Sequence, residues 1–196
     1  MASGLGRRFG GSKLLAELDG VPLLGRALAA TDGLFERRIV VTRSAEAAAW
    51  CRRRGVPVVL HSLPLRSDTI RLGLAAVGAQ SPQPPQGCLF CPSAQPLLRR
   101  QTVAALRGAF LREPDGIWRP AWQGQPGAPV LFPRWAFAEL AALEGQGGGA
   151  VAAAHPDRVR TLPVADRWEL FDVDTPADLA AARQAAALCA GPDSLR

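Results

Sequence analysis

The chain has 196 residues, of which 48% are hydrophobic and 20% are charged, and its formal net charge is +6. This length and hydrophobic content exclude a disordered chain and predict one domain over residues 1–196 with a sizeable core. The positive charge favours anionic partners, which include nucleic acid, acidic membranes and small phosphorylated molecules. The basic residues are scattered and do not alternate with aromatic residues, so we expect no nucleic-acid partner.

Membrane association is also disfavoured by the sequence. No apolar run approaches the length of a transmembrane helix, and the glycine-rich start lacks the apolar core of a signal peptide. We therefore expect a cytoplasmic protein that binds small molecules and has no membrane partner.

The first fifteen residues form a basic, glycine-rich segment, MASGLGRRFGGSKLL. Glycines allow backbone N–H groups to approach an anion, and Arg7, Arg8 and Lys13 add positive charge, so the composition suits a phosphate-binding loop. The spacing matches neither the Walker A motif nor the dinucleotide fingerprint, because Phe9 stands where the latter requires glycine. The alternative is a basic N-terminal segment without a ligand.

Beyond this loop, apolar periodicity predicts helices that alternate with strands. Helices are expected at residues 21–30, 45–54, 68–79, 101–111, from 133 onward and 176–188. Strands are expected at residues 39–42, 56–60, 88–91, 116–118, 128–132, 159–164 and 169–173. This alternation predicts a three-layer, Rossmann-like α/β domain with a mostly parallel mixed sheet, which would bind ligands at the carboxyl ends of its strands.

Two helix starts carry capping signals. Ser44 precedes an alanine-rich helix, and Thr175 is followed by Pro176 and by Asp178 three residues after the cap. A nucleotide-binding α/β domain usually has a strand directly before its glycine loop, whereas here Met1 already lies in the loop. Either translation starts further upstream or the sheet lacks a central strand.

The C-x-x-C motif at Cys88 and Cys91 suggests either a metal or redox site or a purely structural pair. It lies in an apolar run that reads as a strand, in which residues three apart point to opposite faces. This favours the structural interpretation.

Five motifs together resemble the MobA-like nucleotidyltransferases. The most similar branch is that of molybdenum cofactor cytidylyltransferase-like proteins, including those associated with selenium-dependent molybdenum hydroxylases. The motifs are the loop at residues 1–15, the helix start Ser67-Asp68-Thr69-Ile70-Arg71, and the segments at residues 89–98, 127–133 and 171–176.

The resemblance implies that a nucleoside monophosphate is transferred from an NTP, with Mg²⁺, to the terminal phosphate of a molybdopterin-type cofactor, releasing pyrophosphate. CTP is expected rather than GTP or ATP, because the loop lacks the Gly-Gly pair of guanylyl-transferring relatives. A molybdenum hydroxylase is the implied protein partner.

The resemblance also implies roles for individual residues. Lys13 and Arg8 would neutralise the triphosphate and act in catalysis, and Asp174 and Asp172 would bind the metal. The nucleotide-binding positions would be Ala2, Ser3, Gly4, Lys13 and Ser67. Considered without the resemblance, Ser67 reads as a helix cap, and the two aspartates read as residues that stabilise the start of the last helix.

The sequence departs from the family pattern at three positions. Ala94 occupies the position of an aspartate expected to bind the catalytic metal, and a methyl group offers no oxygen ligand to Mg²⁺. Gln146 replaces an aspartate in a glycine-rich loop, and Ala128 replaces a histidine of the cytidylyl-transferring branch. Two hypotheses therefore stay open: an active nucleotidyltransferase, or a protein that binds nucleotide or molybdenum cofactor without turnover.

Overall fold

A computed structural model describes residues 1–4, 6, 8–80 and 83–189 of the chain. Its α-helices are α1 (Leu23–Thr31), α2 (Ala45–Arg52), α3 (Arg66–Gly78), α4 (Arg100–Arg112), α5 (Phe137–Ala141), α6 (Gly149–Ala154) and α7 (Pro176–Cys189). Its strands are β1 (Glu17–Leu18), β2 (Val21–Pro22), β3 (Val40–Thr42), β4 (Val58–Leu60), β5 (Gly87–Phe90), β6 (Ile117–Trp122), β7 (Gln125–Pro126), β8 (Val130–Pro133) and β9 (Val159–Pro163). Short 3₁₀ helices lie at Lys13–Leu15, Arg134–Ala136, Pro156–Arg158 and Arg167–Leu170.

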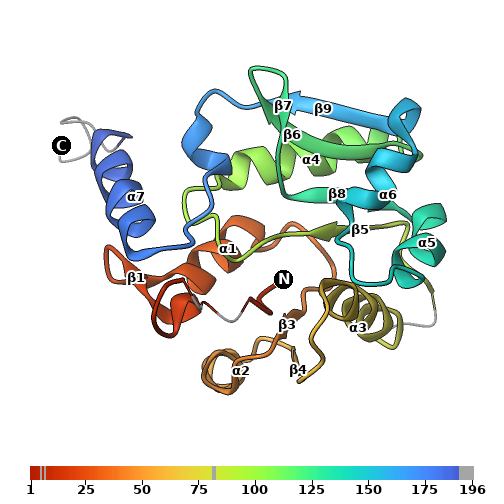
Figure 1. Cartoon of the computed structure of the whole chain (residues 1–196). Helices are drawn as coiled ribbons and strands as arrows, with labels where there is room; N and C mark the ends of the chain where they lie inside the picture. The colour runs from red at the N-terminus through yellow and green to blue at the C-terminus, as the bar shows by residue number, and fades with distance from the viewer. Residues whose placement is uncertain (5, 7, 81–82, 190–196) are drawn as a thin grey trace.

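The central β-structure is divided into two parts (Figure 1). Strands β3 and β4 form a parallel pair, and a five-stranded mixed sheet contains β5, β8, β6, β7 and β9. The expected α/β class with a mixed sheet is thus confirmed. The share of parallel pairing is lower than expected, because β8 runs antiparallel to both β5 and β6.

A hairpin after β6 explains this reversal of direction. The two residues between β6 and β7, Gln123 and Gly124, both have positive φ, which is the geometry of a type I′ turn. The chain then returns as β8 alongside β6. We expected the strand at Gly116 to end at Trp118, but β6 continues through Pro120, whose carbonyl oxygen accepts a hydrogen bond from Gly127 N–H.

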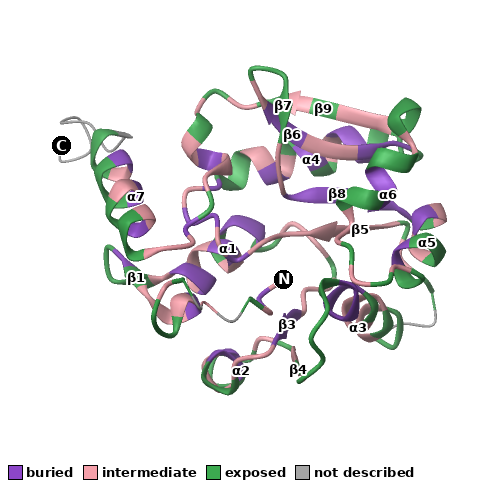
Figure 2. Ribbon diagram, in the orientation of Figure 1, coloured by how far each residue is buried: buried purple, intermediate pink, exposed green. Residues whose placement is uncertain are grey.

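Helices cover both faces of the sheet. Helix α4 packs on β6 and β8, and α3 packs on β3, β4 and α5. Strand β8 is buried along its whole length, and the outer faces of the helices are exposed (Figure 2). The core around β8 consists of the buried residues Ile70, Ile117, Val130, Phe132, Ala136, Leu140, Val151 and Ala152. None of the helices in the described part of the chain is long and apolar enough to cross a bilayer.

Both helix-capping predictions are confirmed. Ser44 Oγ accepts a hydrogen bond from Ala47 N–H at 3.1 Å. Thr175 Oγ1 accepts one from Asp178 N–H, and the Asp178 carboxylate accepts one from Thr175 N–H, so α7 begins with a reciprocal capping box.

One predicted strand is wrong, and one helix was not predicted. Residues 169–173 do not form a strand; the segment begins in the 3₁₀ helix Arg167–Leu170, where Glu169 is buried with an exposed fraction of 3%. Its carboxylate accepts hydrogen bonds from Arg99 N–H, at the start of α4, and from the Thr102 hydroxyl. A strand would carry this side chain away from α4. The helix α6 was not predicted, because three glycines precede it.

Substitution of Glu169 by alanine should destabilise the domain by roughly 2–3 kcal/mol, because it removes the buried carboxylate that accepts the hydrogen bonds of Arg99 N–H and the Thr102 hydroxyl. Urea unfolding measures this loss. Glu113→Ala is the matched control, since Glu113 is exposed and its ion pair with Arg160 should contribute less than about 1 kcal/mol. Equal losses in the two variants would contradict the role of Glu169.

Candidate nucleotide and metal site

The glycine loop starts at the edge of β3. Ala2 N–H donates to the Val41 carbonyl at 2.8 Å, and the Thr42 hydroxyl donates to the Ala2 carbonyl at 2.8 Å. The main chain of Ala2 is therefore fixed where β3 ends. The next residues, Ser3 and Gly4, leave the sheet at the carboxyl end of that strand, where α/β domains bind ligands.

The loop keeps its shape through glycine geometry and one apolar anchor. Gly6 has a φ of +60°, and a Cβ there would lie 2.9 Å from the Gly11 carbonyl oxygen, so no larger residue fits without rearrangement. Phe9 packs against a buried cluster that includes Leu18, Leu23 and Val173. The loop is thus joined to the segment that leads into α7.

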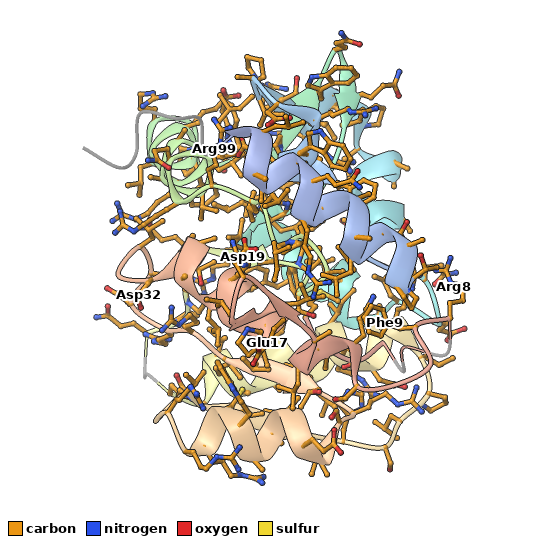
Figure 3. The ribbon with its side chains drawn as sticks, turned by 90° about the vertical axis from the view of Figure 1, so that its left-hand side faces the viewer. Arg8, Phe9, Glu17, Asp19, Asp32 and Arg99 are labelled. Atoms are coloured by element: carbon orange, nitrogen blue, oxygen red, sulfur yellow. The ribbon has the colours of Figure 1, made fainter. Side chains whose placement is uncertain are left out.

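Lys13 and Arg8 converge on Asp174. Lys13 Nζ lies 2.9 Å from Asp174 Oδ1, and Arg8 Nη2 lies 2.7 Å from Oδ2. The Lys13 side chain is 11% exposed and that of Arg8 is 74% exposed, so the Lys13 contact is less screened by solvent. Figure 3 shows Arg8 and Phe9 on the loop beside the end of the blue helix α7. The structure therefore brings together three residues that we expected in one site.

The electrostatics of the two aspartates differ. The hydrogen bond and charge of Lys13, with a contribution from Arg8, hold the pKa of Asp174 below its ordinary value of 3.8. The pKa of Asp172 is raised, although the residue is at the surface. Protein atoms displace water around its carboxyl group, and the negative charge of Asp174 adds repulsion. A hydrogen bond from the Gln95 side chain opposes this shift. Two adjacent carboxylates with different proton affinities therefore lie beside Lys13.

Ala94 lies directly against the aspartate segment. Its carbonyl oxygen accepts a hydrogen bond from Val173 N–H at 2.8 Å, so residue 94 faces the residue between the two aspartates. Ala94 is half-buried. Within the described ranges, no group of three or more His, Cys, Asp or Glu residues is placed to hold a metal ion. Asp172 and Asp174 are thus two carboxylates beside Ala94, the position where the resemblance predicts an aspartate.

Contrary to the capping interpretation, Ser67 is not the N-cap of α3. It lies in the first turn of α3, and its buried hydroxyl accepts a hydrogen bond from Gly145 N–H at 2.9 Å. The N-cap residue is Leu65, whose N–H donates to the Asp68 carboxylate. The helix start is thus capped by Asp68, and Ser67 ties it to the glycine-rich loop before α6.

Two polar residues that the sequence analysis did not single out lie beside the glycine loop. His61 Nε2 is 2.9 Å from Ser3 Oγ. Burial lowers the pKa of His61, and the positive charge of Arg43 nearby lowers it further. His61 Nδ1 and Arg43 Nε are buried without a hydrogen-bond partner among the residues that the structure describes. Each residue directly follows a strand, β4 or β3, and that position was the available sequence signal.

The C-x-x-C residues lie beside the start of the glycine loop, where the Cys91 carbonyl accepts a hydrogen bond from the Met1 amino group at 2.7 Å. Cys88 is in β5 and Cys91 directly follows it, and both are free thiols. Burial raises the pKa of the Cys88 thiol to about 12 and that of Cys91 to about 11. Neither thiol is activated as a nucleophile at neutral pH.

A family model described as the MobA-like NTP transferase domain matches residues 1–159. The chain belongs to this family. The matched region contains the glycine loop, strands β1 to β8 and Ala94, and it ends before Asp172 and Asp174. Among curated proteins, no sequence matches this member of the family.

Solved structures of similar fold cover nearly the whole chain. One is the homologue of Rv0371c from Mycobacterium sp. strain JC1, with 27% identity and a TM-score of 0.77 over 96% of this chain and 94% of that one. Rv0371c from Mycobacterium tuberculosis H37Rv, solved as a manganese complex, has 24% identity and a TM-score of 0.75 over 93% and 95% of the two chains. Molybdopterin-guanine dinucleotide biosynthesis protein A from Archaeoglobus fulgidus has 20% identity and a TM-score of 0.71 over 95% and 96%.

Proposed function

We propose that this protein transfers CMP from CTP to the terminal phosphate of a molybdopterin-type cofactor and releases pyrophosphate. The observation that carries the proposal is the convergence of Lys13 and Arg8 on Asp174 at the end of the glycine loop. A glycine loop whose cations Arg8 and Lys13 lie at the carboxyl edge of an α/β sheet suits a triphosphate. The family membership and the name of the Archaeoglobus relative, a molybdopterin-guanine dinucleotide biosynthesis protein, support a molybdopterin acceptor.

In this proposal the loop residues hold the nucleotide. The main chain of Ala2, Ser3 and Gly4 would follow the nucleoside, and His61, which is kept neutral, would hydrogen-bond to it beside Ser3. An oxygen of the acceptor phosphate attacks the α-phosphorus, the bond to the bridging oxygen of the β-phosphate breaks, and pyrophosphate leaves. Lys13 and Arg8 would turn from Asp174 to the phosphates and neutralise the charge that leaves with pyrophosphate.

The two aspartates are the residues that would bind Mg²⁺. Mg²⁺ is commonly held by one or two carboxylates together with substrate phosphates and water, and Asp172 and Asp174 supply such a pair. When bound, the ion would neutralise phosphate charge. The manganese complex of the mycobacterial relative is consistent with a divalent ion in this fold.

The test is product formation by the purified protein with molybdopterin-bearing acceptor, Mg²⁺ and either CTP, GTP or ATP. Mass spectrometry of the pterin product identifies the transferred nucleotide, and a coupled assay measures pyrophosphate. We expect a cytosine dinucleotide with CTP and at least tenfold less product with GTP or ATP. A guanine or adenine product would overturn the assignment of CTP as substrate but would support the transferase activity. No product with any NTP would overturn the proposed transferase activity.

Ala94 favours a second candidate function, which is a binding protein without turnover. The missing carboxylate weakens the metal site, and the rest of the loop and Asp174 would still hold nucleotide or cofactor. In that case CTP and molybdopterin cofactor bind and no pyrophosphate is released. In either function the partner we propose is a molybdenum hydroxylase that receives the cofactor, which a pull-down with cofactor-free hydroxylase tests.

Metal binding should depend on pH through Asp172. Its pKa is raised above the ordinary 3.8, so the carboxylate takes up a proton at a higher pH than an ordinary aspartate and loses its affinity for a cation. Mn²⁺ binding, followed by electron paramagnetic resonance with CTP present, should weaken as the pH falls through that raised value. In Asp172→Asn this step should disappear, and a step retained in the variant would assign it to another group.

A further inference from the structure

Arg119 of β6 is a half-buried arginine without a carboxylate partner. It forms no ion pair with any residue that the structure describes, and burial lowers its pKa without a nearby carboxylate to oppose the shift. Two other half-buried arginines, Arg26 and Arg38, each have an aspartate oxygen at 3.0 Å. A charge in a partly dehydrated position is costly unless a counter-ion stabilises it. The position of Arg119 therefore suits an anion that a ligand brings.

The guanidinium group of Arg119 is anchored on one side only. Its Nε donates to the Gly127 carbonyl at 2.9 Å, and Gly127 N–H donates to the Pro120 carbonyl at 2.8 Å, so the β6–β7 hairpin holds it. The two terminal nitrogens donate no hydrogen bond within the described ranges, and they are not among the buried unpartnered atoms there. Thr161 of β9 pairs with Arg119 in register, so it shares the same face of the sheet, and it is exposed. The terminal nitrogens are therefore accessible donors.

Packing connects this anchor to the aspartate segment. The 3₁₀ helix that ends at Leu170 packs against β6, and a Cβ on Gly127 would lie 2.8 Å from Leu170 Cδ1. The Leu170 carbonyl accepts a hydrogen bond from Nε2 of the buried Gln95 at 3.2 Å. The Gln95 side chain also hydrogen-bonds to Asp172. A continuous series of contacts thus leads from Arg119 to the candidate metal site.

The loop cations and Arg119 reach the aspartate segment at its two ends. Lys13 and Arg8 contact Asp174, whereas Arg119 is joined through the hairpin to Leu170. In phosphoryl transfer, the attacking and leaving oxygens lie roughly in line on opposite sides of the phosphorus. Because the proposed function assigns Lys13 and Arg8 to the leaving pyrophosphate, the incoming phosphate needs a cation of its own. A guanidinium group with free terminal nitrogens matches the oxygens of a phosphate.

We propose that the terminal nitrogens of Arg119 bind the terminal phosphate of the acceptor and hold it for attack on the α-phosphorus. This inference rests on the proposed nucleotidyl transfer and adds a substrate-binding residue to it. An oxygen of the bound phosphate forms the new bond to the α-phosphorus as the bond to pyrophosphate breaks, and Arg119 keeps its proton throughout. The site therefore selects an acceptor that carries a phosphate monoester over the same acceptor without it.

Calorimetric binding of two acceptors, measured without CTP so that no turnover occurs, tests the inference. One is the molybdopterin-bearing acceptor, and the other is the same compound after removal of its terminal phosphate. The variants are Arg119→Gln, Arg119→Lys and the control Arg160→Gln, which removes an exposed arginine of the neighbouring strand β9. Thermal unfolding checks that each variant keeps its fold.

Arg119→Gln should bind the phosphorylated acceptor at least about tenfold more weakly than the unmodified chain, because charge-assisted hydrogen bonds are lost. Its affinity for the dephosphorylated acceptor and for CTP should change by less than about twofold. Arg119→Lys keeps the charge and should lose less than Arg119→Gln, and Arg160→Gln should bind like the unmodified chain. Unchanged affinity of Arg119→Gln for the phosphorylated acceptor would overturn the inference. An equal loss for both acceptors would also overturn it, because Arg119 would then only shape the hairpin.

Nitrogen-edited NMR of the arginine side chains gives a second readout that needs no variant. In the unmodified chain, the guanidinium signals of Arg119 should shift when the phosphorylated acceptor is added and stay in place with the dephosphorylated one. Signals that do not respond to the phosphorylated acceptor would overturn the inference. Phosphate-dependent binding through Arg119 without pyrophosphate release would support the inference and overturn the proposed transferase. Turnover by Arg119→Gln with an unchanged KM for the acceptor would support the transferase and overturn the inference.

Discussion

Lys13→Met is expected to lower the rate of pyrophosphate release by about 10³-fold, because it removes, from beside the departing phosphates, the less solvent-screened of the two cations that contact Asp174. The Lys13 side chain is 11% exposed and bonds Asp174 at 2.9 Å, so its ammonium group already lies at the site before substrate binds. Methionine keeps the length of the side chain and deletes its charge. Single-turnover rates with saturating CTP and Mg²⁺ separate this loss from weaker binding.

Arg8→Ala is the matched control for Lys13. Arg8 bonds the same carboxylate but is 74% exposed, so solvent screens its charge, and we expect a loss of only about tenfold. A Lys13 variant with the rate of the unmodified chain, or an Arg8 variant that loses more than the Lys13 variant, would contradict the proposed role of Lys13.

Ala94→Asp is expected to raise the same rate by about 10²-fold, because it adds an anionic oxygen ligand beside Asp172 and Asp174. The Ala94 carbonyl bonds Val173 N–H, so the new carboxylate would start from the main chain that lies against the aspartate segment. The gain should appear with Mg²⁺ or Mn²⁺ and vanish with excess chelator.

Ala94→Asn controls for size and polarity without the negative charge, and it should raise the rate by less than about tenfold. Thermal unfolding of both variants checks that the fold is retained. An aspartate variant no faster than the asparagine variant would show that residue 94 does not take part in metal binding in this chain. Turnover confined to the aspartate variant would favour the binding-protein alternative for the unmodified chain.

Local signals in the sequence predicted local structure well. Ser44 and the Thr175–Asp178 capping box act within four residues, and the structure has both caps where the sequence predicts them. Pairing between strands that are distant in the sequence was harder to predict. The antiparallel course of β8 depends on the turn at Gln123 and Gly124, and Pro120 concealed the full length of β6. The 3₁₀ helix at Glu169 depends on contacts with α4, about seventy residues earlier in the chain.

The candidate site also contains some residues that local sequence signals predicted and others that only the folded chain brings together. The glycine loop indicated a phosphate site by composition, but only the family resemblance linked Lys13 and Arg8 to Asp174, which lies at the other end of the chain. His61 and Arg43 carry no local motif, and their relation to Ser3 follows from the adjacency of β3, β4 and Ala2. The contact of Ser67 with Gly145 likewise exists only in the folded chain.

The central claim is that the glycine loop and Asp174 form one site for an NTP and a divalent ion, and equilibrium binding of CTP tests it most directly. Calorimetric titration with Mg²⁺ should show one CTP site per chain, weakened about tenfold or more in Lys13→Met and in Asp174→Asn. Arg160→Ala, a substitution in an ion pair far from the loop, should bind CTP like the unmodified chain. Absence of CTP binding, or equal affinity in all four proteins, would contradict the account.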